Sequence, residues 1–161
     1  MCDDEIDNLV KYFVKLFGKN ENKKIKLSKI VNKKTINIEE HEFKKFMVQF
    51  SVDQIDGKSW VNPIDILIMS INSIEKVNKQ VNLENCNKFT ILWVMCLLSA
   101  KCISSHDHKN KISIAYLSNL GGFQLTDYIY FEKMLLGYLD WRIDISNFDY
   151  QRLSEISVTD D

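Results

Sequence analysis

Residues 89–101 read FTILWVMCLLSAK, an apolar run that ends in a single lysine. A helix that is apolar on nearly all of its sides is surrounded by protein. The run is also shorter than the roughly 20 residues that a transmembrane helix needs. The pattern therefore predicts a buried core helix over residues 88–103, and the other elements of the fold must be arranged around it.

The composition favours helices as the elements that cover this core. The 161 residues include only one Pro and five Gly, and 45% of them are hydrophobic. Few helix breakers and few tight-turn residues argue against an all-β fold, whereas the apolar content is sufficient for a real core. A chain of this length most often forms one domain. We therefore expect a single all-α domain.

Apolar residues spaced three and four apart predict further helices over residues 6–17, 39–50, about 112–117 and about 124–140. Another helix is expected to begin at Asn62 and Pro63, because Asn caps exposed N–H groups and Pro is tolerated at the first helical position. Trp93 and Trp141 are both expected to pack in the core.

The remaining segments are polar. Residues 53–59, which include Gly57, are expected to form a loop. Residues 19–34 hold seven lysines and one acidic residue, Glu21, which is typical of a solvated linker. A phosphorylated or acidic partner for these lysines is the functional alternative. Gly121 and Gly122 are expected to form a turn rather than a phosphate-binding loop, because no strand precedes them and no Lys-Ser/Thr pair follows them.

Charge and cysteine usage exclude several classes of function. The net charge of −1 gives no general attraction to nucleic acid. The N-terminus, MCDDEIDN, lacks the apolar core of a signal peptide. Cys96 and Cys102 lie six residues apart on one predicted helix and cannot share a metal or a disulfide, and none of the four cysteines forms a CxxC pair. These features predict an intracellular protein, cytoplasmic and/or nuclear, without a membrane span, a metal or a cofactor.

Two charges interrupt segments that otherwise resemble protein core. Lys101 closes the apolar run, and Glu132 lies inside the second apolar segment, residues 125–143. Charged side chains are almost never fully buried unless they are paired. The two residues therefore indicate a contact site. The structural alternatives are a lysine that interacts with the dipole at its helix end and a glutamate bonded to Lys133 or to a neighbouring terminus.

At these positions the sequence resembles a cyclin box, most closely the single-box cyclins that partner phosphate-signalling kinases in fungi. The stretch LLSAKCI, residues 97–103, resembles the end of the third helix of the box. The stretch YLSNLGGFQLTDYIYFEKMLLGYLDWRIDIS, residues 116–146, resembles the segment in which a Tyr precedes Gly-Gly and a Glu follows ten residues after the second Gly. Glu132 stands at that distance from Gly122.

The resemblance implies a fold and a function. The fold would be a five-helix cyclin box over residues 37–146, preceded by an N-terminal helix and a Lys/Asn-rich linker over residues 1–36 and followed by a tail over residues 147–161. The chain would be a non-enzymatic regulatory subunit that binds and activates a cyclin-dependent-kinase-like protein kinase. The implied kinase contacts are Lys101, Glu132, Leu136, Cys102 and Ile103. Cys102 and Ile103 stand where cyclins often carry an aromatic residue.

Two other functions remain open at this point. A cyclin-like box can serve as a protein-binding scaffold that does not activate a kinase. An all-α metal phosphohydrolase would use a His-Asp pair with a distant His and Asp, and here His106, Asp107 and His108 would act with His41 and Asp140. The second alternative is disfavoured because the pair falls in a predicted loop and adjacent residues rarely bind one metal.

Overall fold

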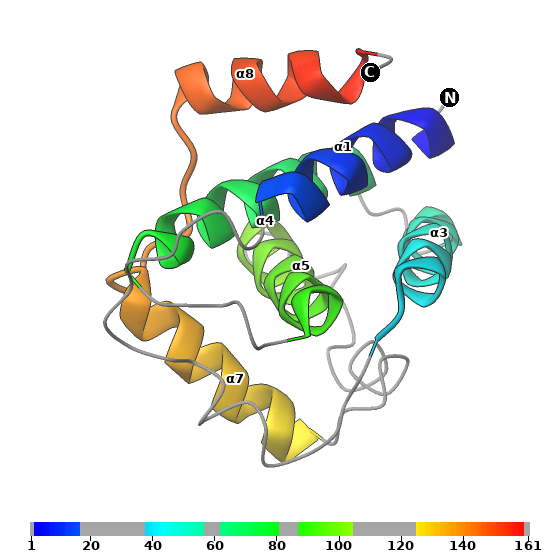
Figure 1. Cartoon of the computed structure of the whole chain (residues 1–161). Helices are drawn as coiled ribbons and strands as arrows, with labels where there is room; N and C mark the ends of the chain where they lie inside the picture. The colour runs from blue at the N-terminus through cyan, green and yellow to red at the C-terminus, as the bar shows by residue number, and fades with distance from the viewer. Residues whose placement is uncertain (1, 17–37, 57–61, 81–86, 105–124, 160–161) are drawn as a thin grey trace.

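A computed structural model describes residues 2–16, 38–56, 62–80, 87–104 and 125–159 (Figure 1). These ranges contain six helices and no strand, so the prediction of an all-α fold is confirmed for them. The helices are α1 (Cys2–Leu16), α3 (Glu40–Asp56), α4 (Pro63–Asn78), α5 (Lys88–Ser104), α7 (Leu125–Tyr138) and α8 (Asn147–Ser157). The short helix expected near residues 112–117 and the predicted 19–34 linker lie outside the described residues.

Helix α5 occupies the centre of the fold, as its sequence predicts. Every residue from Phe89 to Ala100 is buried, and Trp93 is completely enclosed. Helix α3 covers one side of α5, where the Phe46 ring centroid lies 5.2 Å from that of Trp93. Helix α1 reaches the beginning of α5, where the Phe13 and Phe89 centroids are 5.9 Å apart.

Helix α4 packs directly on α5 and is itself buried along most of its length. The amide of Ile64 donates to Asn62 Oδ1 at 2.9 Å, and Pro63 occupies the first turn, so the predicted helix start is confirmed. In the interior, the hydroxyls of Ser70 on α4 and Ser99 on α5 lie 3.0 Å apart. This hydrogen bond satisfies two buried polar groups at the contact between the two central helices.

Two boundaries differ from the sequence-based expectation. The helix predicted to end at residue 50 continues as α3 to Asp56, so residues 53–56 are helical and the predicted loop is wrong there. The physical reason is that this stretch contains neither Pro nor Gly before Gly57, and its polar residues are compatible with a helix. Residues 147–157, expected to belong to a tail, form α8.

Helix α8 lies antiparallel to α1 and also contacts α4, so the two ends of the described chain come close together (Figure 1). The Arg152 guanidinium lies 2.8 Å from Glu75 Oε1 on α4 and donates to the Tyr12 hydroxyl on α1 at 3.0 Å. The Tyr12 hydroxyl in turn donates to Glu75 Oε2 at 2.8 Å. One arginine therefore connects three helices that are distant in the sequence.

We expect Arg152→Met to lower the free energy of unfolding by about 1–3 kcal/mol, because Glu75 would be left mostly enclosed without its cation. The side chain of Glu75 is only 17% exposed. Arg142→Met is the matched control, since Arg142 is 76% exposed and lies 3.6 Å from Asp144. That control should change stability by less than about 0.5 kcal/mol. Urea unfolding followed by circular dichroism measures both; equal losses would contradict the role of Arg152.

Candidate functional site

The structure brings Lys101 and Glu132 together. Lys101 lies in the last turn of α5, and Glu132 lies in the middle of α7. The Lys101 ammonium is 2.9 Å from Glu132 Oε1, which is the distance of a charge-assisted hydrogen bond. The two charges that interrupt the apolar segments therefore form an ion pair that links the central helix to α7.

The two members of this pair differ in their access to solvent. The Lys101 side chain is 53% exposed, whereas that of Glu132 is 14% exposed. Tyr128, one turn earlier on α7, is buried. Burial and, after it, the neighbouring Glu132 carboxylate raise the pKa of Tyr128 above its ordinary value. The Glu132 carboxylate is thus mostly enclosed and lies beside the buried Tyr128 phenol, whereas the Lys101 ammonium lies at the surface.

Two other residues of the predicted contact set, Leu136 and Cys102, lie next to this pair along their helices. Leu136, one turn after Glu132, is partly buried against the core. Cys102 follows Lys101 and is exposed. Ile103 belongs to α5, but its side chain lies outside the described part of the chain.

Apolar surface adjoins the pair on α7. Ile129 precedes Glu132 by three residues and therefore shares its side of the helix, and it is 40% exposed. We define the α5–α7 face as Lys101, Cys102, Ile129, Glu132 and Leu136. It combines an exposed cation, a recessed carboxylate and aliphatic side chains, which is a composition suited to binding another protein.

The metal alternative receives no support from the described ranges. They contain no group of three or more His, Cys, Asp or Glu that could hold a metal ion. His41 lies on α3 and is exposed, and Asp140 follows α7. His106, Asp107 and His108 lie outside the described residues.

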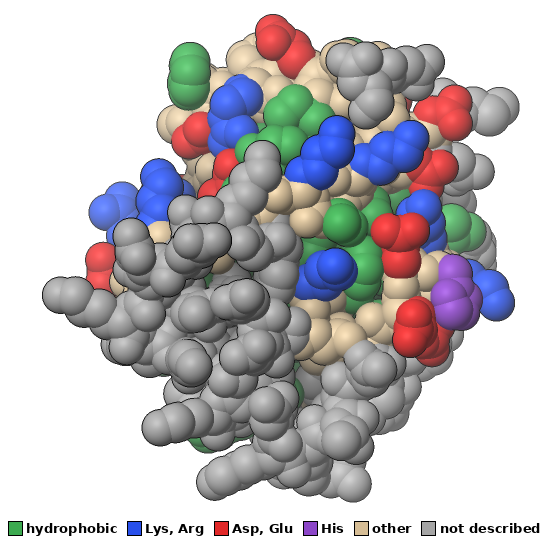
Figure 2. Space-filling model, viewed as in Figure 1, with side chains coloured by type: hydrophobic (Ala, Val, Ile, Leu, Met, Phe, Trp, Pro, Cys, Tyr) green, Lys and Arg blue, Asp and Glu red, His purple; other side chains and the backbone are tan. Residues whose placement is uncertain are grey.

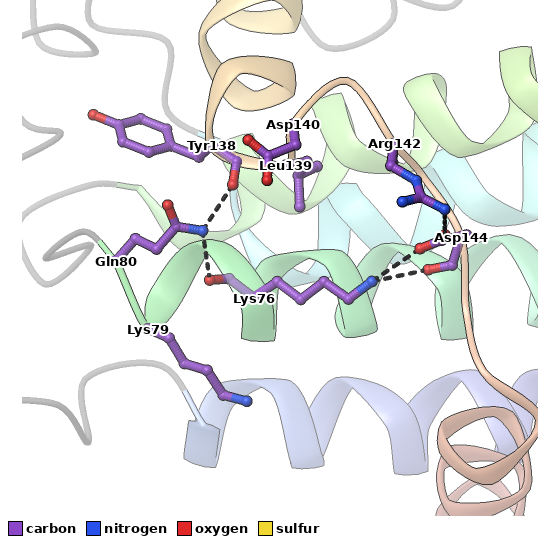
Figure 3. Close-up of a pocket in the computed structure, with 8 residues that line it drawn as sticks. All are labelled: Lys76, Lys79, Gln80, Tyr138, Leu139, Asp140, Arg142 and Asp144. Carbon is purple, nitrogen blue, oxygen red and sulfur yellow. Dashed lines mark hydrogen bonds and ion pairs between the residues drawn. The ribbon is translucent and has the colours of Figure 1, made fainter.

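A second surface feature, which the sequence did not indicate, is a hollow of about 470 Å³ between the ends of α4 and α7 (Figure 3). The Gln80 amide donates to the Tyr138 carbonyl at 2.7 Å, and the Lys76 ammonium donates to the Asp144 carbonyl at 3.2 Å. Helix C-termini present unpaired carbonyls and a negative dipole end. Gln80 therefore satisfies a carbonyl at the end of α7, and Lys76 and Arg142 both form ion pairs with Asp144 of the same chain. The hollow is lined by Lys76, Lys79, Gln80, Tyr138, Leu139, Asp140, Arg142 and Asp144.

Trp141 lies at the edge of this region, and its predicted core position is wrong. It is 66% exposed, whereas Trp93 is buried as predicted. Helix α7 ends at Tyr138, and the chain then turns through two left-handed residues, Asp140 with φ 53° and Trp141 with φ 60°. The Trp141 amide donates back to the Leu136 carbonyl at 2.8 Å, the bond that closes a Schellman-type helix end. This turn directs the indole outward.

On the side of the molecule shown in Figure 2, acidic and basic side chains are interspersed, with small apolar areas between them. Within the described ranges, no helix has the length and apolar character needed to cross a membrane. Comparison with protein-family models, with curated proteins and with solved structures finds no match. The likeness to a cyclin box therefore stays a prediction from the residues.

We expect Trp141→Gly to be more stable than Trp141→Ala by about 1 kcal/mol, because glycine adopts a left-handed conformation without the Cβ penalty. At a right-handed helical position the order is reversed. Lys11, exposed in the middle of α1, provides that control: Lys11→Ala should be more stable than Lys11→Gly. Thermal unfolding of the four variants tests the expectation; the same order at both positions would contradict the left-handed turn.

Proposed function

We propose that this chain is a cyclin-type regulatory subunit that binds and activates a cyclin-dependent-kinase-like protein kinase through the α5–α7 face. The observation that carries the proposal is the Lys101–Glu132 ion pair, 2.9 Å long, at the end of the buried central helix. Both residues occupy the positions that the resemblance to a cyclin box assigns to kinase contacts. The chain would supply no catalytic group, and the ATP site would belong wholly to the kinase.

The composition of the face supports this mode of binding. Ile129 and Leu136 offer apolar area to a partner helix, and burial of such area drives association. The Lys101 ammonium offers hydrogen-bond donors to main-chain or side-chain oxygens of the partner. We expect this face to bind the kinase's regulatory helix better in one position than in another.

Activation would follow from that preference. A protein that binds only the inward position of the kinase's regulatory helix shifts the kinase population toward that position. In the inward position the Lys–Glu pair of the kinase is complete and the phosphates of ATP are held for transfer. A kinase partner would be met inside the cell, in the cytoplasm or the nucleus. A scaffold that retains the kinase without activating it is the competing function.

A pull-down from lysate of the source organism, followed by a kinase assay on the recovered material, tests the proposal. We expect recovery of an active cyclin-dependent-kinase-like enzyme, and we expect Lys101→Ala or Glu132→Ala to weaken the binding at least tenfold. Lys44→Ala is the matched control, because Lys44 forms an ion pair of the same length, 2.9 Å, with Asp7 on a different part of the surface.

Each outcome of this experiment has a distinct meaning. Recovery of a kinase without a gain in its activity would favour the scaffold. Wild-type affinity of the Lys101→Ala and Glu132→Ala variants would refute the assigned face. A thermal unfolding transition lost in either variant would show a structural role instead.

Cysteine labelling provides an independent map of the face. Burial raises the pKa of Cys96 to about 12, so this thiol should resist N-ethylmaleimide in the folded protein. Cys102 is exposed and should react, although the pKa of its thiol is also raised. Bound kinase should slow the labelling of Cys102 severalfold, as measured by peptide mass spectrometry at pH 8. An unchanged rate in the complex would place the interface elsewhere.

A further inference from the structure

We propose that two copies of this chain associate by exchanging residues 142–159, which we call the α8 arm. The arm consists of a non-helical linker, residues 142–146, and helix α8, and it follows the left-handed turn at Asp140 and Trp141. In the exchanged dimer, the arm of each copy would lie on α1 and α4 of the other copy. The proposal is independent of the kinase contact, because neither α1 nor α4 contributes to the α5–α7 face.

The polar contacts that hold the α8 arm join it to helices that are distant in the sequence. They are the contacts of Tyr150 with Asp65 at 2.6 Å, of Asp144 with Lys76 at 3.1 Å, of Arg152 with Glu75 at 2.8 Å, and of the Ser157 carbonyl with the Asn8 amide at 2.9 Å. The residue that meets the arm lies on α4 or α1 in each case. A second copy of the chain presents the same residues in the same arrangement, so the arm can form the same contacts between chains.

The α8 arm is held by little apolar burial. The structure describes the arm throughout, and its one buried apolar side chain is Leu153. Burial of apolar area is the dominant favourable term in folding, and segments with few buried apolar contacts open most easily. The arm can therefore detach from α1 and α4 while the core around α5 stays folded.

The turn before the arm is strained in the closed chain. Asp140 and Trp141 adopt φ angles of 53° and 60°. Aspartate tolerates such angles, whereas a bulky aromatic residue rarely adopts them. The turn leads the chain from the end of α7 past α4 to α8 (Figure 1). If the arm instead reaches across to a second copy, Trp141 can adopt an ordinary negative φ and the strain is released. Short strained hinges favour domain exchange for this reason.

Protein concentration sets the balance between the two forms. In the closed monomer, the linker keeps the α8 arm at a high effective concentration near its own α1 and α4. In the exchanged dimer, the same contacts form and the hinge is relaxed, but two chains must associate. We therefore expect the closed monomer at low concentration and the exchanged dimer at high concentration.

A charge exchange at the contact between Arg152 and Glu75 tests the proposal directly. Arg152→Glu in one chain and Glu75→Arg in another each place like charges together within their own chain. In a mixed dimer with exchanged arms, opposite charges meet at both arm contacts. We expect native mass spectrometry of an equimolar mixture to show at least about tenfold more mixed dimer than the dimer of either variant alone. A chain that carries both substitutions is the matched control and should behave like the wild type.

Hinge variants provide a second test, in which every contact of the arm is kept. Proline cannot adopt a positive φ and has no N–H for the Leu136 carbonyl, so Trp141→Pro should raise the dimer fraction severalfold. Trp141→Gly relaxes the turn in the closed monomer and should lower it. Light scattering over a series of protein concentrations measures both.

The proposal is overturned by either of two results. One is that no mixed dimer forms although circular dichroism shows both charge variants to be folded. The other is that the wild type and both hinge variants have equal dimer fractions, including the case in which all three stay monomeric at every concentration. This second result decides the question even if a charge variant fails to fold. Neither result bears on the proposed kinase contact, which depends on other helices.

Discussion

The complete burial of α5 is the constraint on which the rest of the structure depends. No residue between Phe89 and Ala100 reaches solvent appreciably, so every side of the helix must be covered by another element. Two of its hydroxyls are satisfied internally: the Thr90 hydroxyl donates to Asn87 Oδ1 at 2.8 Å, and the Ser99 hydroxyl pairs with Ser70, whereas the buried Trp93 Nε1 finds no hydrogen-bond partner among the described residues. A buried charge without a partner would be far more costly than these hydroxyls. The helix can therefore carry a charge only where it emerges, and Lys101 is found there.

How much of this could be predicted depends on whether the signal is local. The start of α4 and the extent of α5 follow from a capping Asn-Pro pair and a continuous apolar run, and the structure confirms both. The Lys101–Glu132 ion pair could also be predicted from the sequence, because these two charged residues interrupt apolar segments. Helix α8 had a local signal that was missed: Ser146 accepts from the Asp149 amide at 3.1 Å, a capping pattern, and Leu153 one turn later is fully buried.

The orientation of Trp141 could not be predicted in the same way. Large aromatic residues are usually at least partly buried, and nothing in the sequence marks a left-handed turn there because no glycine occupies it. Aspartate tolerates φ > 0, whereas a bulky aromatic residue rarely does. The position of Trp141 results from how α7 ends and how the chain leads back toward α8. The turn is closed by the bond from the Trp141 amide to the Leu136 carbonyl, and without a glycine the residue types do not signal it.

Two ion pairs of similar length hold helices to the core, and their difference explains why only one of them is assigned to binding. Arg152 and Glu75 are 2.8 Å apart, and the arginine side chain is 32% exposed because it lies among α1, α4 and α8. Lys101 is 53% exposed although its carboxylate partner is more enclosed than Glu75. An ion pair whose cation is exposed contributes little to the stability of the fold. Removal of an enclosed arginine that connects three helices costs more, because it leaves a mostly buried carboxylate without its cation. Stability therefore accounts for Arg152 more fully than for Lys101, and for this reason the proposed contact with a kinase is assigned to the pair that contains Lys101.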